Sequence, residues 1–306
     1  MSASKHQVLD SGRRARAAIR GATLIAVLAA AVVMAPAPAR ATEVLGVVYR
    51  TTPSVAIKLD VYTPSSGSGP FPGAVLVHGG NWRDGWRGDV ADTARELANR
   101  GVVAFAIDFR MPCDPTKIEP GVDPNLCSPS YAFPVPAQDV GYAVAWVRQR
   151  GSLYNAIPGR AGIVGPSSGG NLAMEVGALG TAGRSQPDAI VSWSGIGDLT
   201  WHRQNGAAQR RNYIGCSYPS CPDKWVQASP SLEVGTGDAP LYLSGGESES
   251  IAGDEQNTIN RWNAQGVPTQ WHLVLGSSCH GRTCLSVDPT IWDESVAWLY
   301  QWVPAP

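Results

Sequence analysis

Short apolar runs alternate along this chain with longer segments in which apolar and polar positions are mixed. Short runs bounded by Gly, Pro and polar residues are typical of buried strands, and the longer segments are typical of helices. Polar and apolar residues alternate between Val47 and Tyr62, which predicts an antiparallel hairpin at the start of a sheet. Further strands are expected at 74–77, 102–107, 161–164, 194–197, 239–243 and 271–275, and helices at 89–98, 139–148, 169–176 and from about 254. This order indicates an α/β domain with a mostly parallel sheet.

The first 41 residues have a different pattern. Four arginines precede an apolar run at 22–34: Arg13, Arg14, Arg16 and Arg20. With Ala39 and Ala41 behind it, this run predicts a secretory signal peptide cleaved before Thr42. The run is short for a bilayer, so no stable membrane insertion is expected after cleavage, although an uncleaved anchor is the alternative. Residues 42–306 are then expected to form one exported domain, secreted or periplasmic, by either the Sec or the twin-arginine route.

Charge and cysteine content narrow the function classes. The formal net charge of −1, without a basic cluster, argues against a nucleic-acid partner. The six cysteines form three close pairs: Cys113 with Cys127, Cys216 with Cys221, and Cys279 with Cys284. An even count at short spacing favours disulfides in an oxidising compartment, although six cysteines permit about 15 connectivities. The spacing does not fit a zinc site, so no metal is expected.

The segment Gly165-Pro166-Ser167-Ser168-Gly169 lies between an expected strand and an expected helix. A G-x-S-x-G turn in this context bends the backbone sharply and exposes the serine hydroxyl, so Ser167 is the candidate nucleophile. A serine hydroxyl is weak at neutral pH and needs a base and a third group that orients the base. In this type of site the acid and then the histidine follow the serine along the chain.

His280 is the candidate base, because it follows the expected strand 271–275 directly. His272 is interpreted as a sheet residue and His202 as a surface residue. The candidate acid is Glu249, in the turn after strand 239–243. Three other carboxylates remain open as alternatives: Glu247, Asp254 and Asp198.

A glycine-rich turn follows the expected strand 74–77. Such a turn can point backbone N–H groups at a developing oxyanion. The amides of Gly79 and Gly80, with Asn81 as a further candidate, are expected on one side, and the amide of Ser168 on the other. His78 is interpreted as a structural residue that fixes this turn.

These segments together resemble the signature motifs of α/β-hydrolases of the esterase/lipase group. The motifs are 78–82 (HGGNW), 108–110 (DFR), 136–139 (PAQD) and 165–170 (GPSSGG). The chain looks most similar to hormone-sensitive-lipase-like and feruloyl-esterase-like carboxylesterases, from about Val44 to Val303. It departs from their pattern at Asn81, where many relatives have a third glycine, and at Glu249, where an aspartate is usual.

The resemblance implies an α/β-hydrolase fold, with a mostly parallel eight-stranded sheet flanked by helices. It also implies hydrolysis of carboxylic esters, of a small molecule or a polymer, through an acyl-enzyme, with Ser167, Glu249 and His280 as triad and no cofactor. Asp108, Arg110 and Asp139 match family positions and are interpreted as structural groups beneath the site.

The Cys-containing segment 199–236 is expected to form a short disulfide-stapled lid that sets selectivity. Trp193, Trp271, Trp292 and Trp298 are expected in the core. Four loop tryptophans near the expected mouth are left undecided: Trp82, Trp86, Trp201 and Trp225.

Two other functions stay open: an amidase or peptidase of the same fold, and a non-catalytic binding module on a hydrolase scaffold. Acyl length, alcohol moiety and oligomeric state are not determined by the sequence.

Overall fold

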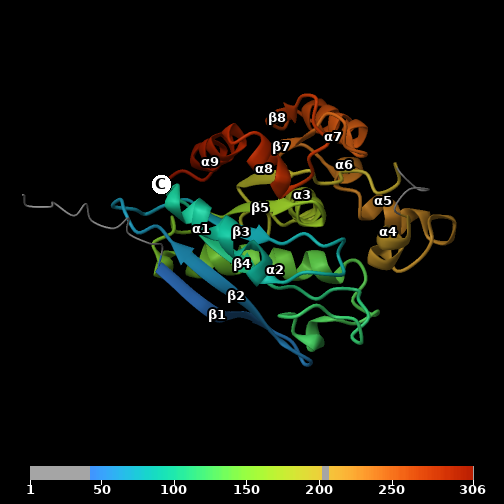
Figure 1. Cartoon of the computed structure of the whole chain (residues 1–306), viewed down its shortest axis with the longest axis horizontal. Helices are drawn as coiled ribbons and strands as arrows, with labels where there is room; N and C mark the ends of the chain where they lie inside the picture. Colours follow the sequence, from blue (N-terminus) through green and yellow to red (C-terminus); the bar gives the residue numbers. More distant parts are fainter. Residues whose placement is uncertain (1–41, 202–206, 306) are drawn as a thin grey trace, which may run out of the picture. The chain divides into compact units, whose positions relative to one another are not determined.

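The computed structural model describes residues 42–201 and 207–305 (Figure 1). The expected signal peptide at 1–41 and His202 lie outside the described residues. None of the helices within these two described ranges has the length and apolar character needed to cross a membrane.

Eight strands form one sheet in the order β1-β2-β4-β3-β5-β6-β7-β8. They are β1 (Thr42–Thr51), β2 (Ala56–Thr63), β3 (Gly73–Val77), β4 (Val103–Ile107), β5 (Gly162–Pro166), β6 (Ala189–Trp193), β7 (Leu241–Gly246) and β8 (Thr269–Val274). β1 pairs with β2, and β2 with β4, in antiparallel register, whereas every pair from β4 to β8 is parallel. The expected hairpin and the mostly parallel eight-stranded sheet are therefore confirmed.

Helices α1 to α7 lie between successive strands from β3 to β8, and α8 and α9 follow β8. They are α1 (Ala91–Asn99), α2 (Val135–Arg150), α3 (Ser168–Leu179), α4 (Ala207–Ile214), α5 (Pro222–Gln227), α6 (Pro230–Glu233), α7 (Ala252–Ala264), α8 (Arg282–Val287) and α9 (Thr290–Trp302). Short 3-10 helices occupy Arg87–Val90, Pro124–Leu126, Gly151–Tyr154 and Tyr218–Ser220.

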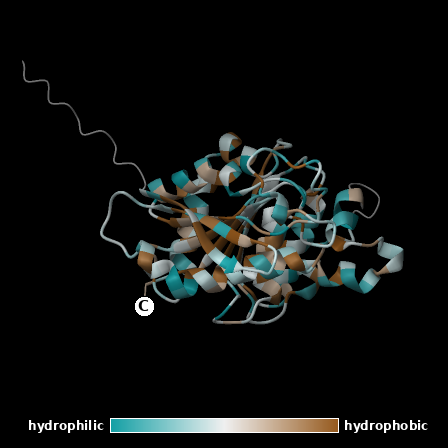
Figure 2. Ribbon diagram, turned by 90° about the horizontal axis from the view of Figure 1, so that it is seen from below, coloured by the Kyte–Doolittle hydropathy of each residue, from teal (hydrophilic) through white to brown (hydrophobic). Residues whose placement is uncertain are grey.

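The central strands are buried on both faces, which explains their continuous apolar runs (Figure 2). Side chains alternate between the faces of a strand, so Val75 and Val77 of β3 join the core beneath α2, α3 and α7. Ala74 and Leu76 join the opposite core, which α1 and α9 cover. A sheet with helices on both faces places the carboxyl ends of its parallel strands at one edge, where loops can converge.

The expected strand 194–197 is wrong. The strand in this region is β6, which ends at Trp193 (Ala189–Trp193), and residues 194–197 form the loop after it. Ser194 has φ of 54°, which ends the extended backbone there. This loop begins at the same edge of the sheet as the turn after β5.

The structure contains three disulfide bonds, which join Cys113 to Cys127, Cys216 to Cys221, and Cys279 to Cys284. Each bond joins nearest neighbours in the sequence, as the spacing suggested.

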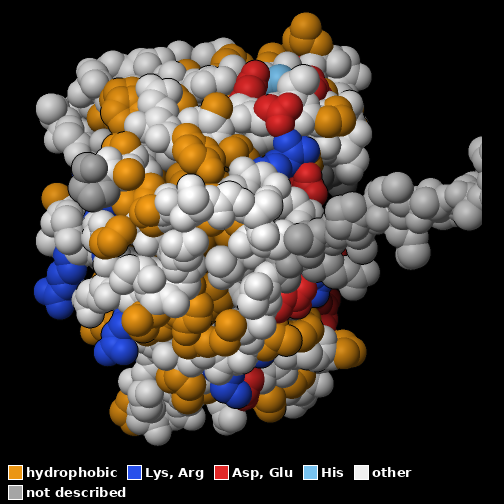
Figure 3. Space-filling model, turned by 90° about the vertical axis from the view of Figure 1, so that its left-hand side faces the viewer, with side chains coloured by type: hydrophobic (Ala, Val, Ile, Leu, Met, Phe, Trp, Pro, Cys, Tyr) orange, Lys and Arg blue, Asp and Glu red, His pale blue; other side chains and the backbone are white. Residues whose placement is uncertain are grey.

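One face of the molecule has apolar side chains interspersed with acidic and basic ones (Figure 3).

Candidate active site

Ser167 occupies the turn between β5 and α3 with φ of 54° and ψ of −123°, a strained conformation for a residue with a side chain. Its N–H donates to the Trp193 carbonyl at 2.8 Å, and its carbonyl accepts the Asn171 N–H at 3.0 Å. A Cβ at Gly165 would lie 2.3 Å from the Gly169 backbone, and one at Gly169 would lie 2.4 Å from the Val77 carbonyl oxygen. The glycines of the motif are therefore needed for the strand and helix to approach.

His280 and Glu249 lie in line with Ser167. His280 Nε2 is 2.9 Å from Ser167 Oγ, and His280 Nδ1 is 2.7 Å from Glu249 Oε2. An ionised carboxylate can only accept, so Nδ1 carries the proton and Nε2 is free to accept from the serine. The structure thus brings together the three residues that the sequence put forward as a triad.

The Glu249 side chain is 4% exposed, whereas that of His280 is 49% exposed. Glu249 Oε1 accepts the Ser194 hydroxyl at 2.9 Å and the Gly246 N–H at 2.9 Å. These two bonds leave Oε2 directed at the imidazole. The Glu249 carboxyl is therefore held both from the loop after β6 and from the end of β7.

The competing carboxylates have other partners. Glu247 accepts the Gly276 N–H at 2.8 Å. Asp254 accepts the N–H groups of Gly197 and Asp198, at 2.7 and 2.9 Å. Asp198 accepts the Thr200 hydroxyl at 2.6 Å. None of these carboxylates has a described contact with His280.

The glycine turn lies against the serine. A Cβ at Gly79 would be 3.1 Å from the Pro166 carbonyl oxygen and 3.5 Å from Ser167 Cβ. Gly80 has φ of 120°, and its carbonyl accepts the N–H of Asp84 at 2.9 Å. The amides of Gly79, Gly80 and Ser168 donate to no acceptor among the described residues, so they are available to a ligand oxygen.

His78 is buried beneath this turn. Its Nδ1 donates to the Gly79 carbonyl at 2.8 Å, and its ring stacks on Phe109 with centroids 4.4 Å apart. Burial lowers the pKa of His78, so the ring is neutral at neutral pH. These contacts agree with a structural role in shaping the turn.

A cleft of about 780 Å³ opens above Ser167 and His280. Most of the residues that line it are polar residues or glycines, and the charged ones among them include Asp84, Asp89, Glu119 and Arg282. Glu119 comes from the loop that the Cys113–Cys127 bond closes. The Cys279–Cys284 bond encloses His280, whose N–H also donates to Thr283 Oγ1 at 2.8 Å. Two of the three disulfides therefore fix loops of this cleft.

The segment 199–236 differs from the expected lid. None of its described residues lines the cleft. Its buried Tyr213 instead stacks on Trp82, with centroids 5.1 Å apart, and its Trp225 is 1% exposed. Such large apolar side chains gain more from burial in the hydrophobic core than from an exposed position over the cleft.

The loop tryptophans differ in how far they are exposed. Trp82 is buried and donates from Nε1 to Asn171 Oδ1 at 2.9 Å, which ties the glycine turn to α3. Trp86 is half-buried, with backbone positions Gly88 and Gly121 against its ring. Trp201 is 50% exposed. Among the expected core tryptophans, Trp193 and Trp298 are buried, whereas Trp271 and Trp292 are partly exposed.

The family-matching polar groups lie outside the cleft. Asp139 is fully buried and accepts from Arg110 at 2.8 and 2.9 Å, and also from Arg50. Asp108 pairs with Arg87. They join the loops after β4 to α2 and to the hairpin, as a structural role requires. Within residues 42–201 and 207–305, no three His, Cys, Asp or Glu side chains form a group that could hold a metal ion.

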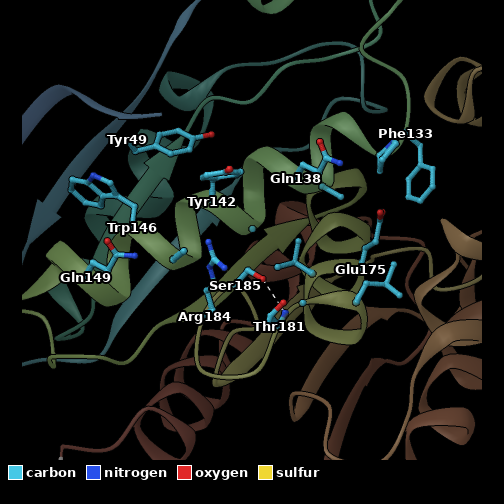
Figure 4. A pocket seen from close by; sticks show the side chains of 17 residues that line it. Tyr49, Phe133, Gln138, Tyr142, Trp146, Gln149, Glu175, Thr181, Arg184 and Ser185 are labelled. Carbon is cyan, nitrogen blue, oxygen red and sulfur yellow. Dashed lines mark hydrogen bonds between the residues drawn. The ribbon is translucent and has the colours of Figure 1, made fainter. Parts of the chain in front are cut away.

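A second cavity of about 500 Å³ lies between α2 and α3 (Figure 4). Tyr142, Trp146 and Glu175 line it, and no candidate nucleophile of the motif reaches it. Glu175 is 1% exposed and accepts the Tyr213 hydroxyl at 2.6 Å. Burial raises the pKa of Glu175 to about 8, so this carboxyl is largely neutral at neutral pH.

This raised pKa predicts a pH-dependent stability. Between the ordinary carboxyl pKa of 4.5 and about 8, the folded state holds a proton that the unfolded state has lost. Stability therefore falls as pH rises through this window, by up to about 1.4 kcal/mol per pH unit. Glu175→Gln should reduce this slope, because the amide cannot ionise and can still accept from Tyr213. Melting temperatures at about pH 5 and about pH 8 test this, and an unchanged slope in the variant would count against it.

The sequence does not predict two residues at the site. Ser194 donates to Glu249, and the buried carboxyl of Glu255 lies beside Glu249. The sequence pattern places Ser194 in the expected strand 194–197. Glu255 sits in an ordinary polar stretch of a helix, and no local signal marks its contact with the loop before α7.

Parts of this chain match a protein-family model and several curated proteins. Residues 59–260 match the family model described as BD-FAE. The chain is 30% identical over 177 residues to the non-reducing polyketide synthase pkbA of Emericella nidulans, covering 54% of this chain and 6% of that protein. It is 28% identical over 157 residues to the carboxylic ester hydrolase LipN of Mycobacterium tuberculosis, covering 49% of this chain and 36% of LipN. The chain thus spans 36% or less of the length of these two curated relatives.

Among solved structures, the chain is similar to a truncated form of carbohydrate esterase from gut microbiota. The TM-score is 0.71 at 21% identity, and the alignment covers 87% of this chain and 97% of that chain. At this identity the likeness shows a shared fold.

Proposed function

The chain belongs to the BD-FAE family of α/β-hydrolase esterases, and from this premise we propose that it hydrolyses carboxylic esters through an acyl-enzyme on Ser167. The observation that carries the proposal is the line of hydrogen bonds from Glu249 through His280 to Ser167, next to free amides of the glycine turn. A nucleophile, a base, an orienting acid and oxyanion donors are the parts that acyl transfer requires.

The reaction follows from the positions of the protons. His280 Nε2 takes the Ser167 proton as Oγ attacks the acyl carbon, and the Nδ1–H bond to Glu249 stabilises the resulting imidazolium. The amides of Gly79, Gly80 and Ser168 hold the oxyanion. His280 then gives its proton to the leaving alcohol. Water, activated by the same imidazole, releases the acid and regenerates Ser167.

The glycine turn provides a test of the oxyanion assignment. Gly79→Ala should lower kcat by about 10- to 100-fold, because the added methyl would crowd the Pro166 carbonyl and displace donors aimed at the oxyanion. Gly253→Ala is the matched control, since its added methyl would meet only Trp201, at 3.7 Å. Equal kcat for both variants in steady-state assays would remove the glycine turn from the mechanism.

The polar cleft supports short acyl groups as substrates. Apart from glycines, Val90 and Pro166 are the only apolar residues among those that line it, so a long alkyl chain would find no large apolar side chain to pack against. Hydrolysis of p-nitrophenyl esters from acetate to palmitate tests this, and kcat/KM should be highest for the shortest acyl groups. A maximum at palmitate would contradict the assignment of the acyl site to this cleft. Turnover of anilides but not of esters would favour the amidase alternative.

We also propose that the protein works in an oxidising compartment after export. Three disulfides among the described residues support this. Cleavage before Thr42 stays a prediction, which sequencing the N-terminus of the exported protein would test.

A further inference from the structure

We propose that Glu255 keeps its proton in the active enzyme and donates it in a hydrogen bond to Glu249, so that it acts as a positioning residue for the triad acid. This inference rests on the proposed function, and it concerns a residue that none of the catalytic steps above uses.

The two carboxyl groups share one space beside Gly245. A Cβ built on Gly245 would lie 2.3 Å from Glu249 Oε1 and 2.3 Å from each carboxyl oxygen of Glu255. Oxygens at this distance from a single point cannot be more than twice that distance apart. The absence of a side chain at Gly245, near the end of β7, is therefore what allows the first turn of α7 to bring Glu255 against Glu249.

Glu255 is fully buried, and neither of its carboxyl oxygens has a hydrogen-bond partner among the described residues. Both oxygens of an ionised Glu255 would thus be buried acceptors without a donor, which is costly. The charged groups that face Glu255 are Glu249 and Asp254, and both are acidic. Both oxygens of Asp254 accept backbone N–H groups, from Gly197 and Asp198, and no hydrogen bond from Asp254 to Glu255 is described.

Arg210 acts on Asp254 and Asp198, and Arg261 lies 3.9 Å from Asp198. The positive charges of Arg210 and Arg261 therefore lie near Asp254 and Asp198. Burial, and next the charge of Glu249, raise the pKa of Glu255 well above its usual range. The neutral carboxyl is thus the form that this environment favours.

Glu249 has room for the bond. An ionised carboxylate accepts about four hydrogen bonds. Three are described for Glu249: Oε1 accepts from Ser194 and Gly246, and Oε2 accepts from His280, so the remaining acceptor position is on Oε2. A protonated Glu255 supplies the fourth, and it turns two carboxyl groups that would repel each other into a donor and an acceptor. One negative charge then remains, directed at His280.

The test compares Glu255→Gln with Glu255→Leu. Glutamine keeps a donor without an ionisable proton, so kcat at neutral pH should stay near the wild-type value. Leucine removes the donor, so kcat should fall about 10- to 100-fold with little change in KM. Loss of the Glu255 proton at high pH would place a second negative charge beside Glu249 and lower kcat of the wild type. Glu255→Gln has no such proton, so its kcat should not show this decline. Glu175→Gln, a buried carboxyl outside the cleft, is the matched control.

Two activity results would overturn the proposal. One is an equal loss of kcat in Glu255→Gln and Glu255→Leu, and the other is wild-type kcat in a folded Glu255→Leu. A second readout does not need activity: the infrared difference between wild type and Glu255→Gln at neutral pH should contain the carbonyl band of a protonated carboxyl. Its absence would overturn the proposal even if the leucine variant fails to fold. An enzyme that shows the band but hydrolyses no ester would instead refute the proposed function.

Discussion

Replacing Ser167 with alanine is expected to lower kcat for ester hydrolysis by about four or more orders of magnitude while the fold is retained. No other hydroxyl is described within hydrogen-bond distance of His280 Nε2. The variant therefore loses the acyl-enzyme route and keeps only what the oxyanion donors and substrate binding contribute. The change removes one partly exposed hydroxyl and leaves the turn backbone, with its bond to the Trp193 carbonyl, in place. Steady-state kinetics with p-nitrophenyl acetate and a thermal melt measure both effects.

Ser231→Ala is the control for this variant. Ser231 is a buried serine of α6 that does not line the cleft. Its loss should leave kcat near the wild-type value. A Ser167→Ala enzyme that retains wild-type kcat would exclude Ser167 as the nucleophile and with it the proposed mechanism.

Glu249→Gln is expected to lower kcat by about 10⁴-fold, as the loss of a triad carboxylate does in related chemistry. The carboxylate keeps the proton of His280 on Nδ1 and stabilises the imidazolium that forms when Ser167 is deprotonated. An amide in its place can donate to Nδ1, which favours the tautomer with the proton on Nε2, and that tautomer cannot accept from Ser167. The loss should appear in kcat, because substrate binding does not involve Glu249.

The matched control is Glu247→Gln, two residues earlier in the same turn. Glu247 is exposed and contacts the Gly276 N–H rather than His280. Its variant should keep kcat within about twofold of wild type. If Glu249→Gln behaves like this control, the triad acid is another carboxylate, and the kinetics of Asp254→Asn and Asp198→Asn would have to identify it.

The sequence predicts those parts of the site that depend on residues close together in the chain. The strained turn at Ser167 needs its glycines within a few positions, and the glycine turn at Gly79 directly follows β3, so both have a readable signature. The order of strands follows from the apolar runs. Because each of these features depends on neighbours in the chain, no long-range contact has to be known.

The features that the sequence does not predict depend on distant contacts. Ser194 reaches Glu249 from 55 positions away, and it does so because the chain turns at a positive φ after β6. The run of 194–197 resembles a strand in composition, yet β6 ends before it. Within segment 199–236, Tyr213 of α4 stacks on Trp82 and donates to Glu175 of α3, and neither partner is near Tyr213 in the sequence.

The measurement that tests the central claim most directly is the mass of the protein after brief exposure to p-nitrophenyl acetate at low pH, where deacylation is slow. We expect a single acetyl adduct on the peptide that contains Ser167, none in Ser167→Ala, and removal of the adduct when the pH is returned to neutral. An adduct on another residue, or ester turnover without any acyl-enzyme on Ser167, would contradict the account.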